Sequence, residues 1–349
     1  HAIFDYILTH RYPLLVCTIL VLYNRINNSL LDRILMDKIG KIVILGGSGF
    51  IGAQLATKLS PISDKIIIPT RDIESNPNLK MVPNLDITQL DVTDDRVLNL
   101  LLKDTDLVIN TIGILNEFDD DNTFDKIHYQ LTKKISSALN QNKIKRYLHI
   151  SSLNADSKSI GKYLQSKGKA EEYLLSETTL FCNVTIFRPS IVFGEADSFF
   201  NKFSTLLKIF PVFPLACPSA KFMPIYVEDL TDFMISTIHD IDTYNQKIDI
   251  TGPNEYTFRE LIDHTLSALK IRRIILPLNN FLSKMQARVF QNLPGKLFTM
   301  DNYQSLQIDS CSDKGFKGTS SLEDIIPKYL NIKTKQKRSR NLRKKSGRG

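Results

Sequence analysis

The chain has 349 residues, enough for one large domain or two modest domains with a sizeable core. Apolar residues make up 42% and charged residues 23%, the balance of an ordinary globular protein. The four cysteines lie far apart without a C-x-x-C pair, which argues against a zinc site or a disulfide framework and favours a reducing compartment. They are Cys17, Cys182, Cys217 and Cys311. We expect no metal site.

The first 35 residues are expected to lie outside the functional fold. Pro13–Tyr23 is apolar but spans 11 residues, too few to cross a bilayer as a helix. A membrane anchor or a signal-peptide core is the alternative for this segment, although no small-residue cleavage site follows it. Met36 stands five residues before the first predicted strand, and no other segment is long and apolar enough to span a membrane.

The stretch 41–52, KIVILGGSGFIG, predicts a phosphate-binding turn between a strand and a helix. Ile42–Leu45 is an apolar run typical of a buried parallel strand, and the glycines that follow are spaced G-x-x-G-x-x-G. Glycine permits the tight turn and the close backbone approach, and the helix start favours a pyrophosphate. The expected dinucleotide-binding residues are Gly46, Gly47, Ser48, Gly49, Phe50, Ile51 and Gly52. The alternative is a tight turn without a ligand.

Strands and helices alternate after this turn. Apolar runs predict strands over residues 65–69, 85–92, 106–111, 146–150 and 183–187, the last ended by Arg188-Pro189. Helical spacing predicts helices over 94–102, 123–141 and 163–175. This alternation predicts an α/β fold with a Rossmann-type, doubly wound parallel sheet over residues 36–195.

The pattern changes past Gly194. Phe199–Phe213 is rich in Phe and Leu, which predicts core or lid, with a contact surface for a hydrophobic ligand or partner as the alternative. A helix is expected within 225–238, a strand over 247–250, and a helix to residue 269 that opens with the capping box Thr257-x-x-Glu260. Residues 196–330 are therefore expected to form a smaller, mostly helical substrate or lid region.

The net charge of +8 is a property of the last nineteen residues, since 331–349 hold nine Lys or Arg and no acid. The rest of the chain has 36 basic and 37 acidic residues. We expect a disordered basic tail that is dispensable for folding and nucleotide binding. Nucleic-acid binding through it is the weakest functional hypothesis, because no aromatics are interleaved with its charges, and anionic lipid head groups suit it equally.

Tyr163 and Lys167 stand at i and i+4 on one face of a predicted helix, twelve residues after Ser151. An ammonium there can lower the tyrosine pKa and hold ribose hydroxyls, and the tyrosine can then act as a general acid or base. The alternative is surface packing. His128, His149 and His239 share no metal-like spacing, so ordinary surface or buried hydrogen-bonded places are expected for them.

Together these segments resemble the short-chain dehydrogenase/reductase superfamily, in its extended or atypical, epimerase/dehydratase-like form. The resemblance is carried by the glycine turn, Asp91-Val92, Asn110–Gly113, Ser151-Ser152, Tyr163-x-x-x-Lys167 and Arg188-Pro189. It implies a cofactor site in which Asp91 and Val92 lie at the adenine, and Lys167 holds the ribose. In the same site, Thr111, Ile112 and Gly113 border the ribose and nicotinamide, and Pro189 is a further cofactor-binding residue. The family's third residue after the fifth strand is a catalytic Ser or Thr, whereas this chain has Leu153, so Ser152 is the candidate substitute.

One branch of that superfamily is more similar still: the dehydrogenase-like accessory subunit of respiratory complex I and its bacterial relatives. LGGSGFIG, INTIGIL, HISSLNAD, IFRPSIVFGEADSFFNKF and TMDNYQSLQIDS resemble that branch. Its members bind NADPH tightly, and turnover in the respiratory complex is not known. The resemblance implies an NADPH-binding accessory or assembly subunit, with complex I subunits or a membrane surface as partners. It also implies a cytoplasmic, bacterial protein, peripheral on the inner membrane.

A preference for NADP(H) over NAD(H) is predicted from Arg71, which follows the second strand about 25 residues beyond Gly46. A guanidinium can grip a 2′-phosphate bidentately. If the strand ends one residue later than predicted, Asp72 takes the ribose instead, and an exposed pair without ligand contact is a third outcome. Two functions stay open: a subunit with a mainly structural nucleotide, or an active oxidoreductase or epimerase on a small or quinone-like substrate that uses Tyr163, Lys167 and Ser152.

Overall fold

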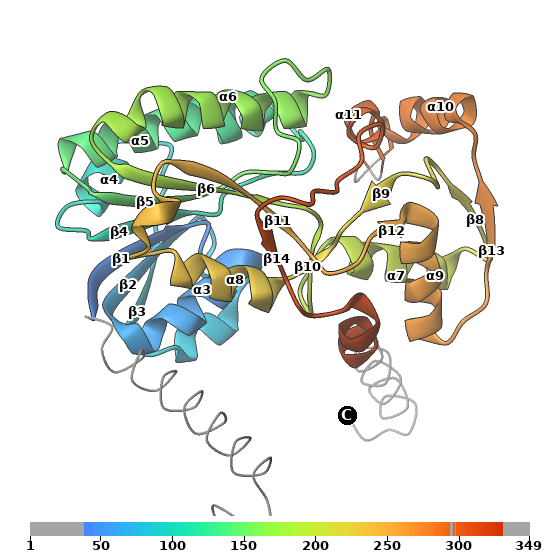
Figure 1. Cartoon of the computed structure of the whole chain (residues 1–349), viewed down its shortest axis with the longest axis horizontal. Helices are drawn as coiled ribbons and strands as arrows, with labels where there is room; N and C mark the ends of the chain where they lie inside the picture. The colour runs from blue at the N-terminus through green and yellow to red at the C-terminus, as the bar shows by residue number, and fades with distance from the viewer. Residues whose placement is uncertain (1–37, 294–295, 297, 331–349) are drawn as a thin grey trace, which may run out of the picture.

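A computed structural model describes residues 38–293, 296 and 298–330 of the chain (Figure 1). The expectations for the first 35 residues and for the basic tail fall outside these residues. Within them, no helix combines the length and apolar character needed to cross a bilayer.

One sheet of eight parallel strands organises the molecule, in the order β14-β11-β6-β5-β4-β1-β2-β3. Its strands are β1 (Ile39–Leu45), β2 (Ser63–Thr70), β3 (Leu85–Gln89), β4 (Leu107–Asn110), β5 (Arg146–Ile150), β6 (Asn183–Pro189), β11 (Gln246–Thr251) and β14 (Phe316–Lys317). The predicted α/β fold with a doubly wound parallel sheet is confirmed. Because all strands are parallel, their carboxyl ends meet at one edge, where ligands of such sheets bind.

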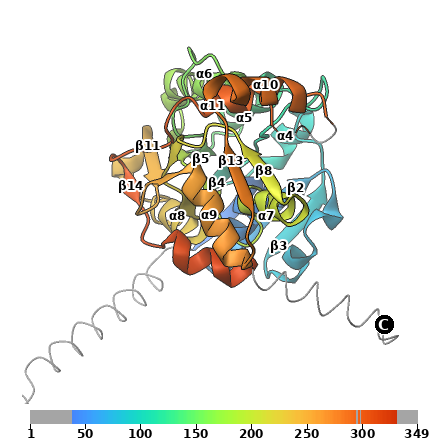
Figure 2. The ribbon, with the colours of Figure 1, turned by 90° about the vertical axis from the view of Figure 1, so that its right-hand side faces the viewer.

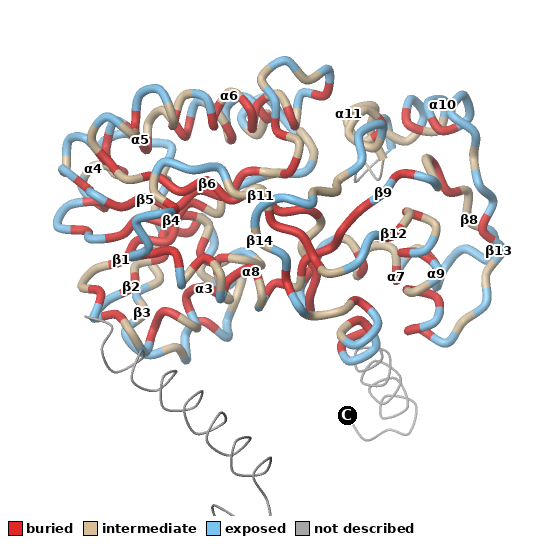
Figure 3. The backbone as a smooth tube through the Cα atoms, in the orientation of Figure 1, coloured by how far each residue is buried: buried red, intermediate tan, exposed pale blue. Residues whose placement is uncertain are grey.

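Helices cover both faces of the sheet (Figure 1). One face carries α3 (Phe50–Leu59) and α8 (Val227–Ser236), and the other carries α4 (Asp95–Leu101), α5 (Leu131–Gln141) and α6 (Lys162–Ser176). Along β1, Ile42 and Ile44 pack in the core on the α3 side, while Val43 and Leu45 pack in the core on the α6 side. Burial on both faces explains why the strands read as continuous apolar runs rather than as alternation, and the strands are the most deeply buried part of the backbone in Figure 3.

Several predicted boundaries are wrong, and three of them have a local reason. β3 ends at Gln89 rather than at residue 92, because the Asp91 carboxylate accepts hydrogen bonds from the Thr93 amide and hydroxyl and turns the chain. β6 continues through Pro189, whose carbonyl accepts from the Leu153 amide at 3.0 Å. The helix predicted over 123–141 begins as a π-helical turn, Asp125–Gln130, before it becomes α5.

The remaining elements build a second part with its own core (Figure 1). Its helices are α7 (Phe199–Ile209), α9 (Phe258–Leu269), α10 (Asn280–Phe290), α11 (Met300–Ser305) and residues 322–330. Its short strands pair as β7 (Val192–Phe193) with β10 (Ile225–Tyr226), β8 (Val212–Leu215) with β13 (Ile274–Pro277), and β9 (Lys221–Phe222) with β12 (Tyr256–Thr257). The predicted capping box is present, since Glu260 accepts from the Thr257 amide and Thr257 accepts from the Glu260 amide. Phe200 and Leu207 lie in the core, as expected for that segment.

The second part is interleaved with the first. β11, β14 and α8 all come from residues 196–330, yet they complete the sheet and cover it. Lys58 of α3 fixes α8 through an ion pair with Asp232 at 2.7 Å and a hydrogen bond to the Glu228 carbonyl. The chain therefore returns to the Rossmann part after building α7 to β10.

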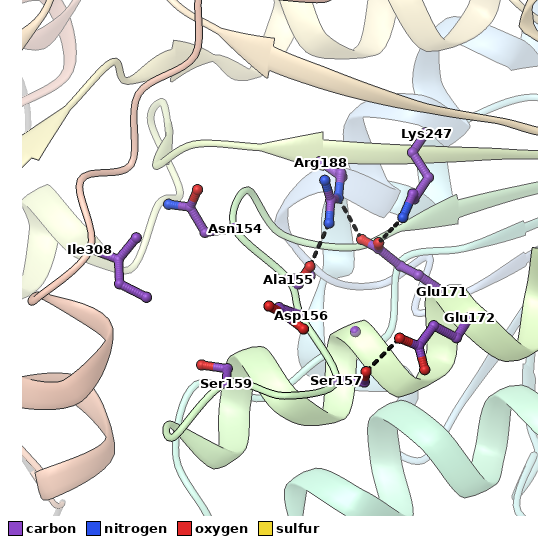
Figure 4. Close-up of a pocket in the computed structure, with 11 residues that line it drawn as sticks. Asn154, Ala155, Asp156, Ser157, Ser159, Glu171, Glu172, Arg188, Lys247 and Ile308 are labelled. Atoms are coloured by element: carbon purple, nitrogen blue, oxygen red, sulfur yellow. Dashed lines mark hydrogen bonds and ion pairs between the residues drawn. The ribbon is translucent and has the colours of Figure 1, made fainter.

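A buried ion cluster joins the last strands of the sheet to α6 (Figure 4). The Glu171 carboxylate, 1% exposed, accepts from Arg188 Nε at 2.8 Å and from the Ser151 hydroxyl at 2.5 Å, and it lies 3.6 Å from Lys247 Nζ. Beside this cluster is a cavity of about 490 Å³ between α6, β6, β11 and the loop 154–159. None of the predicted site residues lines that cavity, so the cluster belongs to the scaffold.

Replacing the central carboxylate tests this assignment. Glu171→Ala removes the buried carboxylate that accepts from Arg188 and Ser151, whereas Lys247 is exposed and Arg188 keeps Asp249 at 3.7 Å, so we expect it to lower the free energy of unfolding by about 1–3 kcal/mol, measured by urea denaturation. The matched control is Glu172→Ala, one residue further along the helix and exposed, for which we expect a loss below about 0.5 kcal/mol. Equal losses in the two variants would contradict the cluster's structural role.

Candidate functional site: the carboxyl edge of the sheet

The glycine turn between β1 and α3 has the geometry that its spacing predicts. Gly46 has φ +77°, which side chains other than glycine rarely adopt. A Cβ on Gly52 would lie 2.4 Å from the Gly46 carbonyl oxygen, so only glycine fits there. Gly49 is the N-cap of α3 and no side chain caps this end, which leaves the positive end of the helix open toward an anion.

The turn after β4 lies directly against the glycine turn. Thr111 donates from its amide and its hydroxyl to the Leu45 carbonyl, at 2.9 and 3.0 Å. Asn110 accepts from the Ile112 amide at 3.0 Å and shapes the next residues. The Ile112 amide nitrogen is 2.9 Å from the position of a Cβ on Gly46. Residues 46–52 and 111–113 therefore form one continuous rim.

Lys167 brings a charged group to this rim from α6. Lys167 is 3% exposed, and its ammonium donates to the Ile150 carbonyl at 3.0 Å. Burial lowers the Lys167 pKa to about 8, against the raising effect of Glu171. A Cβ on Gly113 would lie 3.5 Å from Lys167 Nζ, so Lys167 borders the turn expected to hold the ribose.

Tyr163 lies one helical turn before Lys167 and is half-buried. Burial raises the pKa of its phenol, and a hydrogen bond with the Ser152 side chain lowers it in part. The fold thus brings together the three predicted catalytic residues, Tyr163, Lys167 and Ser152, although Leu153 fills the place of the usual serine. Pro189 lies beside them, joined to Leu153 by the backbone bond described above.

His128 is part of the site, and sequence reasoning missed it. The π-helical turn directs its buried ring toward α6. Its Nδ1 lies 2.9 Å from the hydroxyl of Ser166 on that helix, and its Nε2 accepts from the Ile114 amide, past β4, at 3.1 Å. Because Nε2 accepts, Nδ1 carries the proton and the ring is neutral. Burial and the nearby Lys167 hold the His128 pKa well below its usual value. Ser166 in turn donates to the Tyr163 carbonyl, so one histidine connects the Gly113 turn to the Tyr163 helix.

Asp301 is the second residue that the motifs did not reveal. Its carboxylate oxygens accept from the Tyr163 amide at 3.2 and 3.3 Å, across 138 residues of sequence, and so cap the start of α6. Burial raises the pKa of Asp301 above its usual value. The only sequence signal was the late segment TMDNYQSLQIDS, which resembled the complex I branch but gave no role for this residue.

The edge beside β2 and β3 carries Arg71 and Asp91, the residues expected at the adenosine. β2 runs through Thr70, one residue beyond the prediction, yet the Asp72 carboxylate accepts from the Glu74 amide at 2.9 Å as the cap of a 3₁₀ turn. Arg71 is exposed and donates to the Asn122 side chain at 3.3 Å. Asp91 keeps a lowered pKa, mainly through its bonds to Thr93 and to a lesser degree through Arg71. Val92 follows it and is half-buried.

The other two candidate histidines, His149 and His239, do not belong to any group of possible metal ligands among the described residues. His149 is buried, with Nδ1 3.0 Å from the Tyr147 hydroxyl and 3.3 Å from the Asn110 amide, and His239 is exposed. Across the part of the chain that the structure describes, no three His, Cys, Asp or Glu side chains come close enough to hold a metal ion.

Comparisons with known proteins agree with this geometry. A family model described as NAD(P)H-binding matches residues 46–198. The chain is 27% identical over 299 residues to NADH dehydrogenase [ubiquinone] 1 alpha subcomplex subunit 9, mitochondrial, of Rattus norvegicus, covering 83% of this chain and 78% of that protein. The protein of the same name from Arabidopsis thaliana is 26% identical over 305 residues, covering 82% and 74%.

Solved structures show the same fold. A UDP-N-acetylglucosamine 4-epimerase from Methanobrevibacter ruminantium M1 aligns with TM-score 0.62 and 19% identity over 86% of this chain and 99% of that one. The dTDP-glucose 4,6-dehydratase DesIV of Streptomyces venezuelae aligns with TM-score 0.64 and 16% identity over 83% and 96%. The expected NAD(P)-binding domain, epimerase/dehydratase-like fold and similarity to complex I accessory subunits are thus confirmed. A preference for NADP(H) and a bacterial source stay predictions, since the relatives named above are eukaryotic.

The lowered Lys167 pKa gives a pH dependence. If the ammonium form alone holds the ribose, NADPH affinity falls about tenfold from pH 7 to pH 9, as a group of pKa about 8 loses its proton. The 2′-phosphate, with a second pKa near ~6, is already ionised over this range. Fluorescence titration at each pH measures the effect, and Lys167→Met, which keeps the aliphatic stem, should bind more weakly at pH 7 without the further fall. An equal fall in both proteins would exclude Lys167 as its source.

Proposed function

We propose that this chain, a dehydrogenase-like protein whose residues 46–198 match the NAD(P)H-binding family and whose relatives are subunit 9 proteins, is an NADPH-binding accessory or assembly subunit of a respiratory NADH:quinone oxidoreductase. The observation that supports it best is the extent of the similarity. It covers 83% of the chain at 27% identity and so extends in sequence beyond residues 46–198 into the second part.

The site is suited to holding a nucleotide firmly. The rim of residues 46–52 and 111–113 is fixed by backbone bonds, and Lys167 is fixed by the Ile150 carbonyl before any ligand arrives. A preorganised site loses little side-chain freedom on binding, which favours tight binding. The nicotinamide, when bound, supplies hydride chemistry, while the chain's own groups bind the ribose and hold a proton at the Tyr163 hydroxyl.

The names of the relatives include the word mitochondrial. We propose that this chain lies beside the respiratory NADH:quinone oxidoreductase of its own cell, peripheral to the membrane that holds that enzyme. Co-migration with that enzyme on a native gel tests the partner proposal directly. A tagged full chain should appear in the high-mass band that reduces a dye with NADH. A chain found only as a free species, in cells whose enzyme is intact, would contradict it.

Arg71 is our proposed determinant for NADPH. Its guanidinium sits free to turn from Asn122 to a 2′-phosphate, because the bond to that amide is long and exposed. We expect wild type to bind NADPH more tightly than NADH, and Arg71→Ala to lose ~1–3 kcal/mol of NADPH binding with little change for NADH. Arg96→Ala, an exposed arginine on α4, is the control that should change neither affinity. Equal affinities of the wild-type protein for NADPH and NADH would exclude Arg71 as the determinant of cofactor choice.

A second function is supported by one observation, the place of Tyr163 and Lys167 one turn apart on α6, with Ser152 among the groups that lower the Tyr163 pKa against the effect of burial. This arrangement can transfer a proton to or from a carbonyl or hydroxyl in an active NADP-dependent oxidoreductase or epimerase. If it does, NADPH is oxidised steadily with some member of a carbonyl and quinone panel, and Tyr163→Phe stops turnover while NADPH stays bound. Turnover that survives in Tyr163→Phe would exclude this mechanism.

A further inference from the structure

Three elements, β8, β13 and α10, lie at one end of the second part (Figure 2) and carry exposed apolar side chains. We name this surface the end face. It consists of Val212 on β8, Ile274 and Leu276 on β13, and Phe281, Met285 and Val289 on α10, all of them exposed. Phe281, Met285 and Val289 recur at i, i+4 and i+8, so they form a stripe along one side of the helix, and their exposed fractions are 75%, 50% and 55%.

The end face is not a core surface left open by poor packing, because the opposite side of α10 is fully used. Ser283 and Ala287 are buried against the second part. The Ser283 hydroxyl accepts from the Cys217 amide at 3.1 Å, and the Gln286 amide donates to the Pro214 carbonyl at 3.1 Å. Asn279 caps the helix by accepting from the Leu282 amide. The stripe is therefore held rigidly toward the outside.

β13 and β8 continue this apolar surface beside the helix. In the parallel pair, Ile274 stands opposite Val212, and Ile275 between Ile274 and Leu276 points inward and is buried. Alternation along the strand therefore directs Ile274 and Leu276 to the same outer side as Val212. In Figures 1 and 2, α10 lies directly beside this strand pair.

The segment that carries β13 and α10 has charge of one sign. Residues 264–300 contain six Lys or Arg and no Asp or Glu. The cations are Lys270, Arg272, Arg273, Lys284, Arg288 and Lys296. Outside this stretch and the basic tail, 30 basic residues face 37 acidic ones, a net charge of −7. A cationic stretch without Asp or Glu therefore contains the exposed apolar residues of β13 and α10.

We infer that the end face binds the surface of an anionic phospholipid bilayer, with the apolar stripe among the acyl chains and Lys284 and Arg288 at the head groups. A helix with aromatic and aliphatic residues beside lysine and arginine, and no acid, has the composition of an interfacial membrane helix. A second copy is disfavoured, since it would set Lys284 and Arg288 of α10 against the same two cations of its partner. Protein interfaces are depleted in lysine, and their charges are usually paired. Helix α10 has no Asp or Glu that could pair with the cations of a second copy.

This inference does not rest on the proposed function, because it uses no residue of the nucleotide site. Its test uses the full chain and sedimentation with vesicles of equimolar phosphatidylglycerol and phosphatidylcholine, compared with phosphatidylcholine alone. We expect binding to the anionic vesicles only, weakened by salt. The double variant Phe281→Ser/Met285→Ser should lower the partition coefficient roughly tenfold or more, and Lys284→Gln/Arg288→Gln roughly tenfold to thirtyfold.

Three controls make each outcome decisive. Leu100→Ser, at an exposed leucine on α4 at the other end of the molecule, should bind vesicles as wild type does. Each variant must keep the wild-type melting temperature and NADPH affinity, which shows that the fold is intact. The same losses must also appear in a chain that ends at Ile332, because the basic tail would otherwise account for the binding.

Several results would overturn the inference. Equal binding to neutral vesicles, or end-face variants that bind anionic vesicles as well as wild type does, would do so. A change from dimer to monomer in light scattering would assign the end face to a second copy. Variants that keep vesicle binding but lose co-migration with the respiratory enzyme would assign it to a protein partner.

Discussion

The burial of one ammonium, that of Lys167, is the constraint on which the site depends. A buried charge is costly unless it is hydrogen-bonded, and here the Ile150 carbonyl at the end of β5 accepts from it. That bond fixes α6 against the carboxyl edge of the sheet, with Glu171 one turn further along. Arg188 and Lys247 then neutralise Glu171 from β6 and β11, so the same helix is tied to the scaffold and to the site.

The neutral state of His128 follows from the same burial. A charged imidazole beside the Lys167 ammonium would be repelled, and its two fixed partners already require one donor and one acceptor. The ring therefore acts as a rigid link between the turn at Gly113 and the helix that carries Tyr163. Asp301 holds the start of that helix from the far end of the chain. The geometry of Tyr163 thus depends on groups from β4, the π-helical turn and α11.

Local patterns in the sequence were enough for the sheet, the glycine turn and the capping box at Thr257, because each depends on residues a few positions apart. They were not enough for His128 or Asp301, whose roles arise when segments 38 and 138 residues apart in sequence meet. The two-residue strand β14 was likewise beyond reach, since Phe316–Lys317 is too short to carry a period. The end of β3 was misplaced because Leu90 and Val92 continue the apolar pattern of the strand past Gln89.

The central claim is that this chain holds an NADP-type dinucleotide at the carboxyl edge of its sheet. The most direct measurement is mass spectrometry of the nucleotide released by denaturing the purified full chain, with its oxidation state read from absorbance. The account predicts a near-stoichiometric amount of NADPH or NADP⁺, and loss of that nucleotide from Gly52→Val, whose side chain cannot fit against the Gly46 carbonyl. Release of NAD(H) alone, or of no dinucleotide from a chain that also fails to bind added NADPH, would contradict it.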